Sequence, residues 1–102
     1  MNLISEERAR LSPRLVDMDR GVLLNQIDVA SQFLLTLPDY QIGPYQDKNG
    51  DGIADDVESL IKEACVFMII HSLDGTMDRT SLSDVRLLLQ NYKRPGRAPM
   101  VC

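Results

Sequence analysis

The sequence predicts an all-α fold with three to four helices. Apolar residues recur at helical spacing in two long segments, and no segment alternates apolar and polar residues as a half-buried strand does. The chain has 102 residues, of which 44% are hydrophobic and 25% charged, so it fits one domain with one core. The longest unbroken apolar run, 64–70, has seven residues. A membrane-spanning helix needs about 20, and no membrane span is therefore expected.

The first helix is predicted to be short. Ser5 can cap it, and Glu6 and Glu7 follow in the first turn, where the helix dipole favours acids. Pro13 stands after a serine, which suggests a second helix start there, or a break.

A long helix is predicted from about Asp19 to Thr36, and Pro38 ends it. Its apolar residues recur at spacings of four, three, four and three and so share one face: Leu23, Ile27, Ala30, Leu34 and Leu37. We expect this face to be core, with a partner-binding face as the alternative. The next segment, 38–46, holds two prolines and one glycine and is predicted to be a loop. Tyr40, Ile42 and Tyr45 could hold it against the core.

A strongly apolar helix is predicted after Glu58. Its apolar positions follow the i, i+3, i+4, i+7 pattern: Val57, Leu60, Ile61, Ala64, Cys65 and Met68, with Leu73 at the end. Because 64–70 is apolar on every face, this helix is expected to be buried all round. It is either the central helix or partly an oligomer interface.

The last helix is predicted to follow a loop at 73–80. Residues 81–84 (SLSD) match a capping box, and the helix should run to about Tyr92. One domain is expected over 1–94, followed by a disordered, flexible basic tail at 95–102. From Arg86 onward the chain has four bases and no acids. A solvated tail is the simpler interpretation, and a docking site for an acidic partner is the alternative.

The net charge of −4 comes from one segment, 47–58, which holds five acids and one base. Such a cluster repels itself unless a cation neutralises it. An acidic surface also disfavours nucleic acid as a partner. The segment reads DKNGDGIADDVE and matches the pattern D-x-[DN]-x-[DN]-G-x₅-E at every specified position.

This segment resembles the calcium loop of the EF-hand superfamily. The resemblance implies that Ca²⁺ is held by oxygen atoms of six residues: Asp47, Asn49, Asp51, Ile53 (through its backbone carbonyl), Asp55 (often through water) and Glu58. Gly52 would supply the sharp turn, and Glu58 would close the site with both carboxylate oxygens.

Two features depart from the EF-hand pattern. Residues 43–46 (GPYQ) cannot form the entering helix, and Ala54 stands where a branched apolar residue usually bridges to a paired loop. In both respects the segment is similar to the loops of dockerins and thrombospondin type 3 repeats, which are followed but not preceded by helix. A degenerate second loop at 74–86 is an alternative to an ordinary helix start there, but Arg79 replaces its glycine and no acid closes it.

Other chemistry is weakly indicated. His71, the only histidine, is expected to face the last carbonyls of its helix, and a catalytic pair with Asp74 lacks a nucleophile. The two cysteines, Cys65 (predicted core) and Cys102 (predicted exposed), form no redox or zinc motif, although a bridge between them is conceivable. We therefore expect a protein that is not an enzyme.

The leading hypothesis is a small calcium-binding protein with one competent site and a structural ion. The first alternative is an interaction module, an adaptor or a small subunit, that contacts a protein partner or self-associates through apolar helix faces. The second is a calcium sensor. The N-terminus has no secretory signal pattern, which suggests the cytoplasm, whereas an unpaired loop of this type suggests the calcium concentrations found outside cells.

Overall fold

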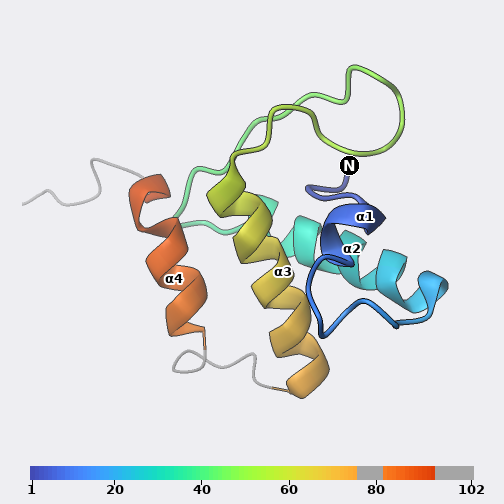
Figure 1. Cartoon of the computed structure of the whole chain (residues 1–102). Coiled ribbons are helices and arrows are strands. Elements are labelled where there is room, and N and C mark those ends of the chain that lie inside the picture. The colour runs from blue at the N-terminus through green and yellow to red at the C-terminus, as the bar shows by residue number, and fades with distance from the viewer. Residues whose placement is uncertain (76–81, 94–102) are drawn as a thin grey trace, which may run out of the picture.

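The computed structural model describes residues 1–75 and 82–93, and in these ranges the chain folds into helices joined by loops (Figure 1). The helices are α1 (Glu6–Ala9), α2 (Arg20–Leu35), α3 (Ser59–Asp74) and α4 (Ser83–Leu89), and a 3₁₀ turn (Gln90–Tyr92) follows α4. The described part contains isolated β-bridges but no strand. The all-α prediction is thus confirmed at the level of fold class.

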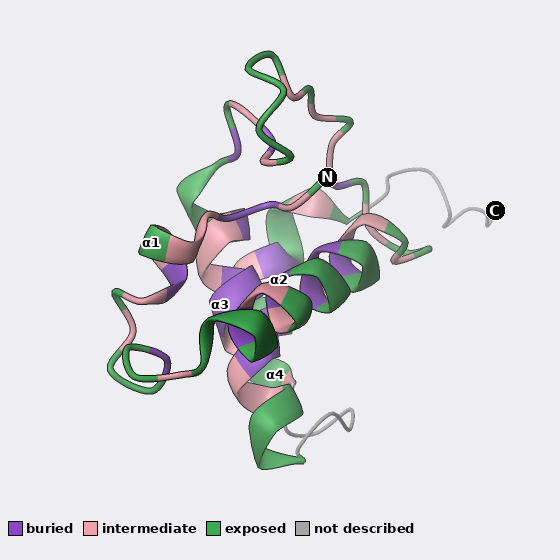
Figure 2. Ribbon diagram, turned by 90° about the vertical axis from the view of Figure 1, so that its right-hand side faces the viewer, coloured by how far each residue is buried: buried purple, intermediate pink, exposed green. Residues whose placement is uncertain are grey.

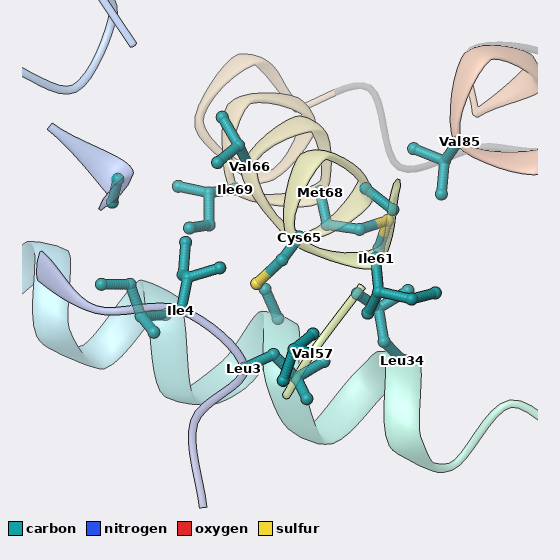
Figure 3. Close-up of a cluster of buried hydrophobic side chains, with 14 of the residues drawn as sticks. Leu3, Ile4, Leu34, Val57, Ile61, Cys65, Val66, Met68, Ile69 and Val85 are labelled. Carbon is teal, nitrogen blue, oxygen red and sulfur yellow. The ribbon is translucent and has the colours of Figure 1, made fainter. Parts of the chain in front are cut away.

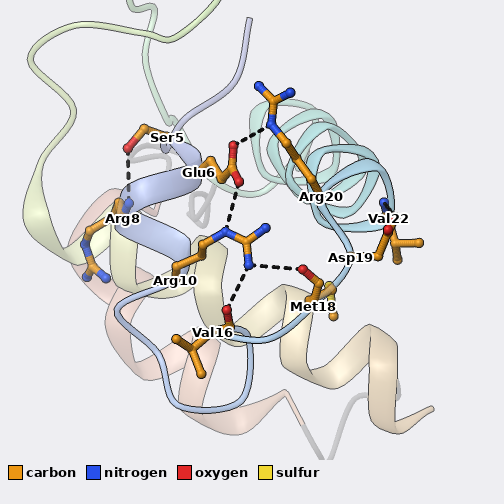
Figure 4. Close-up of polar contacts among 9 residues, drawn as sticks. All are labelled: Ser5, Glu6, Arg8, Arg10, Val16, Met18, Asp19, Arg20 and Val22. Carbon is orange, nitrogen blue, oxygen red and sulfur yellow. Dashed lines mark hydrogen bonds and ion pairs between the residues drawn. The ribbon is translucent and has the colours of Figure 1, made fainter.

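The short first helix forms as predicted, because the Ser5 hydroxyl accepts a hydrogen bond from the Arg8 N–H at 3.1 Å. No helix starts at Pro13, and residues 10–18 make a series of turns instead. The Arg10 guanidinium stabilises these turns, since it donates to the carbonyls of Val16 and Met18 at 2.9 and 3.0 Å (Figure 4).

α2 confirms the predicted helix at 19–36. The Asp19 carboxylate accepts from the Val22 N–H at 3.2 Å and caps its first turn. Its buried residues are those of the predicted apolar face, together with one serine: Leu23, Ile27, Ala30, Ser31 and Leu34. The face is therefore core, as expected.

α3 is the central helix of the fold. It packs against α2 on one side and α4 on the other, and most of its middle is buried (Figures 1 and 2). Within 64–70 five residues are buried, and Phe67 and Ile70 are partly buried. The expectation of all-round burial is largely met, and the helix ends at Gly75 in the left-handed conformation.

The N-terminal segment completes the core in a way that helical periodicity does not predict. Leu3 and Ile4 lie outside any helix, are almost wholly buried, and lie between α2 and α3 (Figure 3). The Leu3 N–H donates to the Ser31 hydroxyl at 2.9 Å, which satisfies both polar groups inside the core.

α4 begins in a different register from the predicted capping box. Leu82 is the cap residue and makes no side-chain cap bond, while Ser81 lies outside the described residues. Asp84 consequently falls at the second helical position, where its carboxylate approaches His71 instead. The helix proper ends at Leu89, and the 3₁₀ turn carries the chain to Tyr92. The predicted flexible tail at 95–102 and Cys102 lie outside the described residues.

Candidate functional site

The predicted calcium loop, 47–58, forms the outer part of the connection between α2 and α3 and projects from the helices (Figure 1). An antiparallel bridge joins its two arms, in which the Asp55 N–H donates to the Gln46 carbonyl at 2.7 Å. Ala54 and Val57 are buried and anchor the returning arm to the core. The loop before it, 38–46, is pinned as predicted, with Ile42 buried and Tyr40 and Tyr45 packed against the core.

The first half of the loop wraps around the Asp47 carboxylate. This carboxylate accepts from the Asp51 N–H at 3.2 Å and from the Gly52 N–H at 2.7 Å. The Asp51 carboxylate in turn accepts from the Ile53 N–H at 3.0 Å. These contacts, first of all the Gly52 N–H, lower the pKa of Asp47, so the group favours its charged form. Asp47 and Asp51 are thereby brought together.

Glycine is required where the loop turns most sharply. Gly50 and Gly52 have φ of +71° and +80°, in the left-handed region that disfavours side chains. Gly52 is the residue for which the sequence predicted this turn. Asn49, another predicted ligand, is exposed beside it.

The chain's own N-terminus pairs with the middle of the loop. The Asn2 N–H donates to the Gly52 carbonyl at 2.8 Å, and the Ala54 N–H donates to the Asn2 carbonyl at 2.7 Å. Ile53, predicted to offer its carbonyl to the ion, lies between these two bonds and forms a parallel bridge with Asn2. Sequence reasoning missed Asn2, because a backbone pairing over 51 residues leaves no trace in side-chain type.

The acids in the second half of the loop have partners other than Asp47 and Asp51. The Asp55 carboxylate accepts from the Lys48 N–H at 2.7 Å, and Asp56 pairs with the Lys48 ammonium at 3.3 Å. Glu58 accepts from the Tyr45 hydroxyl at 2.8 Å. Among the described residues no three histidine, cysteine or acidic groups converge closely enough to hold a metal.

The Glu58 carboxylate also influences a second tyrosine. The pKa of Tyr45 is raised, by burial first and then by the hydrogen bond to Glu58. The pKa of Tyr92 is raised by burial and by the charge of Glu58. The carboxylate therefore faces phenol groups from the loop and from the 3₁₀ turn.

The donor set nevertheless suits calcium. Ca²⁺ binds carboxylate and carbonyl oxygens, and the loop offers four carboxylates at the predicted ligand positions. The first carboxylate is already oriented by backbone N–H groups. The closing residue, Glu58, caps α3 without a side-chain cap bond, so helix formation leaves its carboxylate available. The residues fit the ion in kind, and Glu58 would have to turn from Tyr45 to reach it.

The other sequence candidates lie away from this loop. Asp74, the first position of the degenerate second loop, is the last residue of α3 and pairs with Arg14; the middle of that loop lies outside the described residues. His71, expected to face the last carbonyls of its helix, has its Nε2 atom 3.0 Å from Asp84 Oδ1 on α4. Cys65 is buried, which raises the pKa of its thiol to about 12 and makes a reactive thiolate unfavourable.

A groove of about 260 Å³ lies between α2 and α4. Apolar side chains, among them Phe33, Met68 and Val85, line it, and Arg86 and Lys93 border it. Val22, Val29 and Phe33 continue the exposed apolar surface along α2, since they are seven and four residues apart on one helix face.

Comparisons of the chain with protein-family models, with curated proteins and with solved structures gave no match. Among the described residues, no helix is long and apolar enough to cross a membrane. The candidate site therefore stands on its residues and geometry alone.

Proposed function

We propose that this protein binds one calcium ion in the loop 47–58 and that the ion is structural. The orientation of Asp47 carries the proposal: two backbone N–H groups hold its carboxylate in the loop. A loop whose backbone N–H groups orient the acid at its first proposed ligand position is suited to a cation. The proposed oxygen donors are Asp47, Asn49, Asp51, the Ile53 carbonyl, Asp55 and Glu58.

The ion would add a further link between the loop and the helix that follows it. Asp47 follows the loop that leaves α2, and Glu58 caps α3, so a cation between them ties the loop to the start of the central helix. It would also neutralise the repulsion among the acids of 47–58. A ligand that binds only the folded state stabilises it by about 2.7 kcal/mol at one hundred times its dissociation constant.

Calorimetry of the metal-stripped protein tests the proposal. We expect one calcium site, preference for Ca²⁺ over Mg²⁺, and a melting temperature that rises with calcium. Asp47→Asn should weaken binding strongly, whereas Asp28→Asn, which removes an exposed acid on α2, should leave it unchanged. Absence of both heat and thermal shift in the wild-type protein would refute the calcium site.

A second candidate function is a non-enzymatic interaction module. The exposed apolar face of α2 favours it, because Val29 and Phe33 remain 52% and 39% exposed beside the groove. We propose a second copy of the chain as the partner of this face. Sedimentation should then show concentration-dependent dimers that Val29→Glu abolishes, with Asn25→Glu, on the same helix, as the charge control. A monomer at all concentrations would reject this alternative.

A further inference from the structure

A side-chain hydrogen bond joins Tyr45, just before the loop, to Glu58, the last residue of the loop. The Tyr45 hydroxyl donates to Glu58 Oε1 at 2.8 Å. Tyr45 precedes the first proposed ligand by two residues, and its ring packs against the core. The Glu58 side chain is exposed and its residue begins α3. The tyrosine is thus the fixed partner, and the carboxylate is the group that can turn.

Glu58 cannot make this contact and close the proposed site in the same orientation. Closure of such a loop uses both oxygens of its last acid on the ion. In the described structure Glu58 is not gathered with two other acidic groups, and its Oε1 faces the tyrosine. Calcium binding must therefore break the hydrogen bond. A hydrogen bond to a charged acceptor is stronger than one between neutral groups, so its loss opposes binding.

We propose that Tyr45 sets the calcium affinity of the loop by competing with the ion for Glu58. This inference rests on the proposed function. The coupling is reciprocal: the factor by which Tyr45 weakens calcium binding equals the factor by which calcium weakens the Tyr45–Glu58 contact.

The loop that carries Tyr45 also contacts the 3₁₀ turn near the C-terminal end of the described chain. The Gln41 N–H donates to the Tyr92 carbonyl at 2.7 Å, and Tyr40 bridges to Lys93, so the 38–46 loop is joined to the 3₁₀ turn. Burial first, and then the nearby Glu58, raise the pKa of both Tyr45 and Tyr92. When Glu58 turns toward the ion, Tyr45 loses its acceptor and Tyr92 loses a nearby negative charge.

Tyrosine emission reports this step directly, because the chain has three tyrosines and no tryptophan. A carboxylate that accepts from a phenol quenches its emission, and calcium should therefore increase the emission of the wild-type protein. The test variant is Tyr45→Phe, which keeps the ring and removes only the hydroxyl. Tyr40→Phe is the matched control, since that tyrosine lies in the same loop and packs against the same core.

In calorimetry of the full chain, Tyr45→Phe should bind calcium about 3- to 10-fold more tightly than wild type, and Tyr40→Phe should bind like wild type. The calcium-dependent rise in emission should shrink in Tyr45→Phe and persist in Tyr40→Phe.

Two results would overturn it, and they differ. If wild type binds calcium and Tyr45→Phe has the same affinity, the site exists and the competition does not. If neither protein binds calcium, the proposed function fails and the competition fails with it.

Discussion

Ser31 should be the most sensitive polar residue of the core. It is fully buried on α2, and its hydroxyl accepts from the Leu3 N–H at 2.9 Å. Ser31→Ala leaves that N–H buried without an acceptor, which costs about 1–3 kcal/mol. Alanine is the better helix former, but the difference within a helix is below about 0.7 kcal/mol. We therefore expect a net loss of about 1–2 kcal/mol in the free energy of unfolding.

Thermal and urea denaturation measure this loss. For a domain of this size each kcal/mol lowers the melting temperature by roughly 4–8 °C. Ser72→Ala is the matched control, because it makes the same change at an exposed position of α3 and gains helix propensity without losing the Leu3 contact. Equal stability of the two variants would show that the Leu3–Ser31 bond contributes nothing.

The same variant should affect the proposed calcium loop. Leu3 is adjacent to Asn2, whose backbone bonds to Gly52 and Ala54 in the loop. If Ser31→Ala loosens the N-terminal segment, hydrogen exchange at the Ala54 amide should accelerate, whereas Ser72→Ala should leave it unchanged. Unchanged exchange at Ala54 in both variants would mean that the pairing with Asn2 does not depend on the anchor at Leu3.

Two further predictions concern the backbone and pH. Gly52→Ala places a side chain at φ +80°, so it should lower the free energy of unfolding by about 1–2 kcal/mol and weaken calcium binding. Gly21→Ala in α2, where the new Cβ meets Asp19 only at 3.4 Å, should instead raise the free energy of unfolding by about 0.5–1 kcal/mol. Denaturation of the two variants measures both changes. The Arg20 and Arg10 guanidinium groups lower the pKa of Glu6 below its ordinary value of 4.5. The charged Glu6 therefore stabilises the folded state fully above its unfolded pKa, and this stabilisation is lost as the pH falls through its folded pKa. The free energy of unfolding should consequently fall less steeply with decreasing pH in Glu6→Gln than in wild type. Identical dependence of the free energy of unfolding on pH in the two proteins would contradict this.

The helices could be predicted because their signals are local. The apolar face of α2 repeats at helical spacing within one segment, and Asp19 caps it from the adjacent position. The first helix is specified in the same way by Ser5. The register of α4 was missed because Leu82 caps it without a side-chain bond, so no residue type marks the boundary.

Contacts across long sequence separations could not be predicted in the same way. The buried pair Leu3 and Ile4 is too short to show a period, and Ser31 differs from other polar residues of α2 only because Leu3 reaches it. The position of Glu58 depends on Tyr45, which is in a loop with no regular pattern. The motif indicates the residue types of the proposed ligands, whereas the hydrogen-bond partners of these residues depend on the fold.

The pairing of Asn2 with the loop bears on how strongly a single, unpaired loop can bind an ion. A flexible loop that becomes ordered on binding an ion loses conformational entropy, and this loss weakens binding. Here the backbone of Asn2 occupies both sides of Ile53, so part of that ordering is already achieved before any ion arrives. Tyr45 acts in the opposite direction, since it holds the closing carboxylate away. If the loop binds calcium as proposed, its affinity depends on both the pairing with Asn2 and the hydrogen bond from Tyr45. Substitutions that weaken the pairing with Asn2 should lower the affinity, and loss of the Tyr45 hydroxyl should raise it.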